Sequence, residues 1–194
     1  DKAISQLQQN AATKSNNSQI LNLPKDSSNV IPQETLTTEQ AAQAKDGQEV
    51  TAGNVNAKIN VNGKDVQPGD KPQINQYTPV DVHLDFNLTG QTIHPNDYFK
   101  FTIDNPGNIL NIEGSPSISL KNSAGQEIAV VTMQSGNDLI SGQVTFTTGG
   151  NDAVGEFDVQ LKVDESKANQ TVDVPVTITL PNDHRITAIF HYVP

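Results

Sequence analysis

Polar and apolar residues alternate along most of the chain after about residue 54. In the stretch PVDVHLDFNL, residues 79–88, every even position from Val80 to Leu88 is apolar, and aspartate, histidine or asparagine stands between them. A period of two places successive side chains on opposite faces of a β-strand. The pattern therefore predicts a strand with one buried face and one solvated face.

The stretch NDYFKFTIDNPGNIL, residues 96–110, shows the same alternation and carries three aromatic rings. Phe99, Phe101 and Ile103 fall on one side of the predicted strand, Tyr98 falls on the other, and an Asn-Pro-Gly turn follows. No aromatic residue occurs in the first 76 positions. These rings therefore mark the place where the chain begins to build a core, and most are expected to be core anchors.

Seven further segments alternate in the same way, and turn-forming residues rich in Gly, Asn, Asp and Ser separate them. About nine or ten short strands without a convincing helix between them predict an all-β fold, an antiparallel Ig-like β-sandwich. A jelly roll or a barrel is the structural alternative. Pro175 lacks an amide donor, so it is expected on an edge strand or at a bulge. The seven segments are residues 54–61, 115–121, 126–133, 141–148, 155–163, 170–180 and 184–193.

Residues 1–50 differ in composition from the rest. They are rich in Gln, Asn, Ser, Thr and Ala and contain no aromatic residue, so they cannot bury enough surface to offset chain entropy. We interpret them as a mostly irregular polar leader before a sandwich domain at 51–194. Residues 1–12 and 37–47 carry short helical patterns, but helices of about a dozen residues do not persist alone in water.

The length, charge and residue composition of the chain exclude several classes of protein and partner. The 194 residues allow one domain plus an appendage, and the chain opens at Asp1 without a signal peptide, as expected of a mature or trimmed fragment. The net charge of -10 argues against nucleic acid and anionic membranes, and no run approaches the roughly 20 apolar residues of a membrane helix. The absence of cysteine excludes disulfides and thiolate sites, and in an exported protein it is typical of Gram-positive surfaces.

Catalytic and metal-binding patterns are not evident in the sequence, and no enzyme is predicted. The histidines lie without metal-ligand spacing and are interpreted as surface or rim residues, although two distant ones meeting at a zinc ion is left open. Asp81 and Asp85 share a strand face, which they are expected to solvate. The four histidines are His83, His94, His184 and His191.

Calcium is the one cofactor that the sequence leaves open, because Asn and Asp crowd the turns GNDAVGEFD and HPND. Turn formation explains these residues as well and is the favoured interpretation. A Lys–Asn isopeptide crosslink, common in surface adhesins, needs an uncharged lysine on a buried face. Lys58, Lys100 and Lys162 all fall on the polar parity of their strands, so we predict no such crosslink.

The order of several segments resembles the fibrinogen- and collagen-binding adhesins of Gram-positive cell walls, the MSCRAMM group, in their first Ig-like ligand-binding subdomain. The resemblance covers about residues 54–183 and runs through NVNAKINV, VDVHLDFNL, HPNDYFKFTI, PGNILNI, the SAGQEIAVVTMQSGNDLISGQVTFTT hairpin and GEFDVQLKV. The family's Thr-Phe-Thr is followed by Asp-Tyr-Val, which is associated with receiving a latching strand. Here TFT is followed by Thr-Gly-Gly, so a complete latch mechanism is not predicted.

The resemblance implies a non-catalytic adhesin module at the bacterial cell surface, anchored to the cell wall through a C-terminal region outside this chain. The expected partner is a host or extracellular-matrix protein or glycan, together with an adjacent module. A stalk or spacer module is the alternative, and a carbohydrate-binding module ranks lower because the chain has no Trp. Tyr77, Tyr98 and Tyr192 are candidate exposed contacts, although a place at the core rim is the favoured interpretation.

Overall fold

The computed structural model describes residues 18–22, 47–51 and 53–194, and in β1 (Ser18–Asn22) it describes the backbone alone. The helices predicted over residues 1–12 and 37–47 lie outside the described residues, apart from Gly47. Within the described residues the chain forms fifteen strands and three short 3-10 turns. The predicted all-β class is therefore confirmed.

Nine strands of five or more residues follow β1, and each coincides with a predicted segment. Burial alternates along β5, where every apolar residue is buried and every polar residue is half-buried, whereas the first six residues of β13 are all buried. The nine are β2 (Asn54–Val61), β5 (Val80–Asn87), β7 (Tyr98–Asp104), β9 (Ser117–Lys121), β10 (Glu127–Ser135), β11 (Leu139–Phe146), β13 (Val154–Val163), β14 (Val172–Leu180) and β15 (His184–Tyr192).

Five strands of two or three residues were not predicted, because alternation cannot be detected over so short a length. Three of them pair with the edges of longer strands, and β6 and β12 pair with each other in a separate two-stranded sheet. They are β3 (Lys64–Asp65), β4 (Gln73–Ile74), β6 (Thr92–Ile93), β8 (Leu110–Ile112) and β12 (Gly150–Asn151), and the 3-10 turns are η3 (Pro106–Asn108), η4 (Glu165–Lys167) and η5 (Pro181–Asp183).

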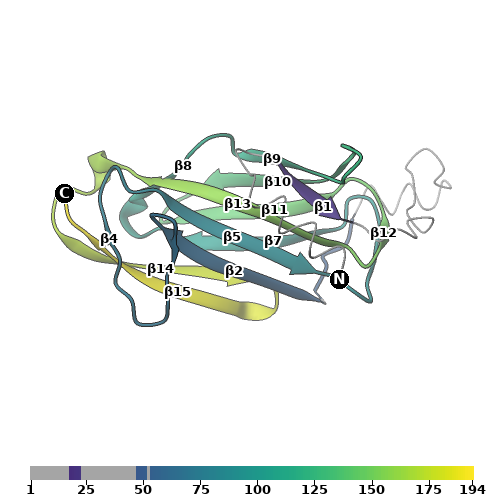
Figure 1. Ribbon diagram of the computed structural model, residues 1–194, viewed down its shortest axis with the longest axis horizontal. Coiled ribbons are helices and arrows are strands. Elements are labelled where there is room, and N and C mark those ends of the chain that lie inside the picture. The colour runs from purple at the N-terminus through teal and green to yellow at the C-terminus, as the bar shows by residue number, and fades with distance from the viewer. Residues whose placement is uncertain (1–17, 23–46, 52) are drawn as a thin grey trace.

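The strands form two stacked layers (Figure 1). One layer has the order β3-β2-β5-β13, with β8 also paired to β13, and the other has the order β9-β10-β11-β7-β14-β15-β4. Apart from the parallel pairing of β4 with β15 and of β1 with β9, the neighbours in these layers are antiparallel. This is the predicted sandwich.

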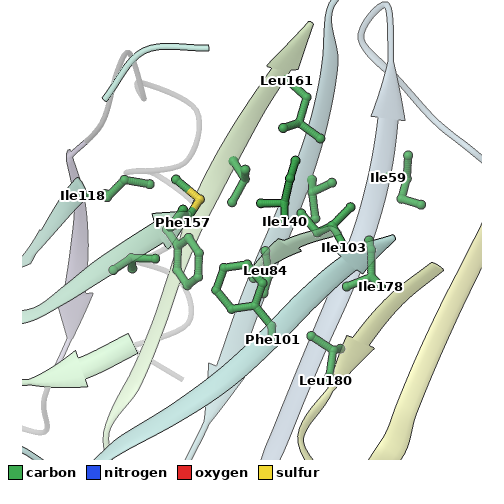
Figure 2. Close-up of a cluster of buried hydrophobic side chains, with 14 of the residues drawn as sticks. Ile59, Leu84, Phe101, Ile103, Ile118, Ile140, Phe157, Leu161, Ile178 and Leu180 are labelled. Atoms are coloured by element: carbon green, nitrogen blue, oxygen red, sulfur yellow. The ribbon is translucent and has the colours of Figure 1, made fainter. Parts of the chain in front are cut away.

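Aromatic rings fill the space between the two layers. Phe86 packs edge-on against Phe99 at 5.4 Å between ring centroids and against Phe146 at 5.9 Å. Figure 2 shows Phe101 and Phe157 among aliphatic side chains that come from both layers. The prediction that the rings anchor the core is confirmed for every phenylalanine, since none exceeds 2% exposure: Phe86, Phe99, Phe101, Phe146, Phe157 and Phe190.

Strand β1 joins the two layers along one side, which the sequence did not predict. It pairs antiparallel with β13 at Leu21 and Asn22, and parallel with β9 from Ser18 to Ile20. It lies within the segment interpreted as a polar leader. A strand in this position supplies hydrogen-bond partners to the facing edges of β9 and β13.

Pro175 lies in an interior strand, β14, but on a stretch that is paired on one side only, so its position is an edge position. It stands opposite Ile189 of β15, whereas β14 pairs with β7 only at Ile178 and Thr179. The amide that proline lacks would point away from β15, toward the side where β7 has already ended at Asp104. The missing donor therefore interrupts no ladder.

Replacing Gly142 with alanine should destabilise the fold. Gly142 is buried in β11 opposite Phe101, and a Cβ atom there would overlap the Phe101 ring. Overpacking of this kind costs about 1 to 3 kcal/mol, which corresponds to roughly 3 to 10 °C in Tm for a domain of this size. Thermal unfolding of G142A checks this. The control is G136A, where the nearest atom would be Leu139 O at 3.6 Å, and an equal loss in both variants would contradict the argument.

Removing β1 should lower stability. A chain that begins at Gly47 leaves the facing edges of β9 and β13 without the strand that pairs with both. We expect a Tm at least about 4 °C below that of a chain that begins at Lys14 and keeps β1. Equal melting of the two truncated chains would support the interpretation of residues 1–50 as a dispensable leader.

Candidate functional site

Two of the hollows on the described surface carry both acidic and basic side chains and bear on function. The first, which we call the His83 cleft, has a volume of about 420 Å³ and lies on the outer face of the β2-β5-β13 layer. The second, which we call the open-edge groove, has a volume of about 520 Å³ and lies between β2, β3 and β15. The cleft is lined by Lys58, Asn60, Gly63, Asp65, Asp81, His83 and Asp158.

The strand register arranges the outer face above the His83 cleft in cross-strand rows. Lys58 of β2 stands opposite His83 of β5, which stands opposite Asp158 of β13. The next row on the same face places Asp85 opposite Glu156. Opposite charges on facing strands attract, and like charges repel. The rows therefore surround one imidazole with carboxylates.

His83 is held between two carboxylates of β13. Its Nδ1 lies 3.0 Å from Asp158 Oδ1 and its Nε2 lies 3.3 Å from Glu156 Oε1. Burial by itself would lower the pKa of His83, but the hydrogen bonds to Asp158 and Glu156 and their negative charge outweigh it and raise the pKa to about 9. The ring is therefore protonated near neutral pH.

Asp85 is the neighbour on the same strand. Burial raises its pKa, and the nearby Glu156 raises it further, while His83 and Lys58 lower it. An imidazolium fixed by two carboxylates is a poor proton acceptor at neutral pH. The arrangement therefore favours a structural lock between β5 and β13 over acid–base chemistry.

The open-edge groove runs between the edges of the two layers. Its apolar lining comes from Ala57, Ile59, Val66, Ile186 and Ala188, and charged groups stand at its rim. Figure 1 shows β15 along the lower margin of the molecule, with β2 above it. The remaining lining residues are Lys58, Asp65, Gln67, Pro68, Arg185 and Thr187.

A side-chain hydrogen bond lies at one end of this groove, and a short strand pairing lies at the other. At one end, Asn182 Nδ2 donates to Thr51 O at 2.6 Å. At the other end, β4 pairs with β15 at His191 and Tyr192, and Asp173 accepts hydrogen bonds from Lys71 and His191 that lower its pKa. The middle of β15 lies open between these ends.

The three candidate tyrosines fall in different environments. Tyr77 is 83% exposed, on a turn in which the side chain of Asn75 accepts a hydrogen bond from the Tyr77 amide. Tyr98 is half-buried, and Lys100 lies 5.6 Å from the centre of its ring. Tyr192 is only 2% exposed and belongs to the core, so the expectation of an exposed contact there is corrected. It lies on the inward parity of β15 together with Phe190.

The residues considered for a metal site or a crosslink do not form one in the described part of the chain. Among the described residues, no group of three or more His, Asp or Glu side chains is arranged to hold a metal ion. In the two acidic stretches, Asp97 accepts a hydrogen bond from the His94 amide within its own turn, and Asp152 accepts one from the Gly90 amide of another loop. The three lysines considered for a crosslink are exposed, as their strand parity predicts: Lys58, Lys100 and Lys162.

Comparison with protein families identifies the domain. The family model described as bacterial Ig domain matches residues 73–173, which is 101 of the 194 residues. The chain belongs to the bacterial Ig domain family. The matched region of this bacterial Ig domain begins at β4 and reaches into β14, so it includes both strands that form the His83 lock. No curated protein sequence matches the chain.

A solved structure of a Gram-positive surface protein shares the fold. The serine-rich repeat adhesion glycoprotein Srr1 from Streptococcus agalactiae superposes with a TM-score of 0.54 at 15% identity, over 76% of this chain and 49% of that one. The collagen adhesin from S. aureus gives 0.43 at 18% identity, over 75% and 45%. The major pilin subunit BcpA of Bacillus cereus, in its D312A form, gives 0.39 at 14% identity, over 73% and 40%. The bacterial Ig domain thus spans about half or less of each chain, and the predicted resemblance to Gram-positive adhesins is confirmed at the level of fold.

The sequence interpretation missed the groups that surround His83. Glu156 and Asp158 were recognised as part of a strand and of the acidic stretch GNDAVGEFD considered for calcium, but not as partners of a histidine. The pairing of β13 with β5 brings them to His83, and that pairing joins residues 75 positions apart.

In the described part of the chain, no helix has the length and apolar character needed to span a bilayer.

The contacts of His83 with Asp158 and Glu156, which we call the His83 lock, should make the free energy of unfolding fall as pH rises into the alkaline range. The pKa of His83 is about 9 in the folded protein and 6.5 in the reference state, so the folded state binds the proton more tightly. Its contribution is fully present below pH 6.5 and is lost as pH rises toward 9. Urea unfolding should show a loss on the order of 1 to 3 kcal/mol between about pH 6 and 9.5 that is absent in H83Q.

The matched control is H94Q, because the His94 side chain is 46% exposed. This variant should keep the alkaline loss of the unmodified chain. An identical pH profile for H83Q and the unmodified chain would refute the lock.

Proposed function

We propose that this bacterial Ig domain is a non-catalytic adhesin module of a bacterial surface protein, and that it binds a host or extracellular-matrix macromolecule in the open-edge groove. The observation that carries the proposal is the groove itself. It combines an apolar lining, including Ile59 and Ala188, with charged residues of both signs at the rim. Apolar hollows with a few polar groups are typical of recognition sites.

The chemistry of the other hollow supports a binding role over a catalytic one. In the His83 cleft the imidazole is already committed to Asp158 and Glu156, so it is not poised to accept a proton. The likeness to Srr1, which is named as an adhesion glycoprotein, agrees with the proposal. Location at the bacterial cell surface is part of the same proposal.

Binding of the domain to a panel of extracellular-matrix proteins and glycans tests the function. We expect at least one member to bind, and we expect K58E to weaken that binding at least about tenfold. Lys58 is exposed at the rim of the groove, and reversing its charge alters the electrostatic match to the partner. Surface plasmon resonance at physiological salt is the measurement.

K121E is the matched control. Lys121 is exposed at the end of β9, and its substitution by glutamate changes the net charge as much as K58E does. It should bind as the unmodified domain does. Failure of every panel member to bind would contradict the adhesin function and favour a spacer module. Equal weakening by both variants would contradict the groove as the site.

A further inference from the structure

Another hollow, which we call the hydroxyl hollow, lies on the outer face of the larger layer, over the middle of β10, β11 and β7. It has a volume of about 370 Å³. Met133, Gly142 and Phe101 form one cross-strand row beneath it, and their main chains line its floor because this row faces the core. The outward residues that line it are Lys100, Thr102, Thr132, Gln134, Ser141 and Gln143.

The strand register arranges these six outward side chains in two cross-strand rows. In one row, Gln143 of β11 stands between Thr132 of β10 and Lys100 of β7. Ser141 is the centre of the other row, two residues earlier on β11. Side chains of facing and diagonal residues on one sheet face lie within reach of one another. The two rows therefore form one continuous polar surface over three strands.

The polar groups of the hydroxyl hollow suit a ligand that carries hydroxyl groups. Five of the six outward side chains are hydroxyls or carboxamides, each of which can donate and accept a hydrogen bond. Gln143 Nε2 donates to Thr145 Oγ1 at 2.9 Å, whereas the other four make no side-chain hydrogen bond to another described residue. A sugar hydroxyl also donates and accepts, so it can pair with any of them.

The charge of the hydroxyl hollow differs from that of the outer face of the smaller layer. That face carries Lys58, Asp85 and the His83 lock. In the hydroxyl hollow only Lys100 is charged, and its Nζ lies 5.6 Å from the centre of the Tyr98 ring. The ring attracts this cation, and the net charge of -10 repels an anionic ligand. The ligand that fits is therefore polar and uncharged.

An apolar margin borders the hydroxyl hollow at one end. The next outward row places Thr145 of β11 between Val130 of β10 and Tyr98 of β7, and all three are half-buried. Tyrosine offers ring area together with a polar tip. A sugar ring has the matching character, because its edge carries hydroxyl groups and its faces carry C–H groups.

We propose that the hydroxyl hollow is a second binding site of this domain and that it binds a neutral oligosaccharide. Ser141 and Gln143 hydrogen-bond to sugar hydroxyls at its centre, Lys100 donates to a further hydroxyl, and Tyr98 contacts the C–H groups. The hydroxyl hollow shares no lining residue with the open-edge groove. A sugar in the hollow and a macromolecule in the groove can therefore be tested separately.

Substitution of Gln143 by alanine tests the central contact. The matched control is Q160A, because Gln160 is also half-buried, on β13 of the other layer. Both variants lose one carboxamide and keep the net charge. The probes are maltotriose, cellotriose, chitotriose and lactose, with sialyllactose as the anionic counterpart of lactose. Titration calorimetry and NMR titration are the measurements.

We expect at least one neutral probe to bind, and we expect Q143A to weaken its binding at least about fivefold, because a hydrogen-bond partner is lost. Q160A and K58E should bind this probe as the unmodified domain does. Addition of the probe to the unmodified domain should shift the amide NMR signals of Lys100, Ser141 and Gln143.

Binding of none of the neutral probes would overturn the proposal, and so would tighter binding of sialyllactose than of lactose. Equal effects of Q143A and Q160A would show that the site does not depend on the hollow. Weakening by K58E but not by Q143A would place the sugar in the open-edge groove and equally overturn the proposal. If Q143A fails to unfold cooperatively, the amide shifts decide alone, and shifts confined to strands other than β7, β10 and β11 would overturn the proposal.

Discussion

Hydrogen bonding along the strand edges governs this domain, because every buried backbone amide and carbonyl needs a partner. On one side of the sandwich, β1 lies between β13 and β9 and joins the two layers into one continuous ladder. On the other side, β2 and β15 face each other without pairing, and side-chain contacts such as that of His184 Nδ1 with Val55 O cross between them. The two sides of one core thus differ in how their edges are closed.

Charge on the outer face follows from the same pairing. The register between β5 and β13 that buries Leu84 and Phe157 on the inner face sets His83 against Asp158 on the outer face. A buried ion pair of this kind needs good geometry to offset the loss of hydration. Two carboxylates bonded to one ring meet that need, so the lock connects the packing of the core to the electrostatics of the surface.

The candidate sites were harder to predict than the fold. Each histidine and acid within a predicted strand, such as His83, could be assigned to its polar face, because parity is a local property. The partner of His83 could not be assigned, since it depends on which strand pairs with β5 and in which register. Tyr192 illustrates the reverse case. Its ring has a polar tip, but its parity on β15 is inward, and that parity decides its burial.

The sequence by itself determined the all-β class, the nine longer strands, the burial of the phenylalanines and the polar faces, because a period of two is encoded within each strand. It also determined that Pro175 belongs at an edge, because the missing amide is a property of the residue itself. Only the tertiary structure decided that β1 closes one side and that β15 stays open on the other. Edge pairing joins backbone groups, which are the same in every residue except proline, so side-chain patterns carry little information about which edges meet.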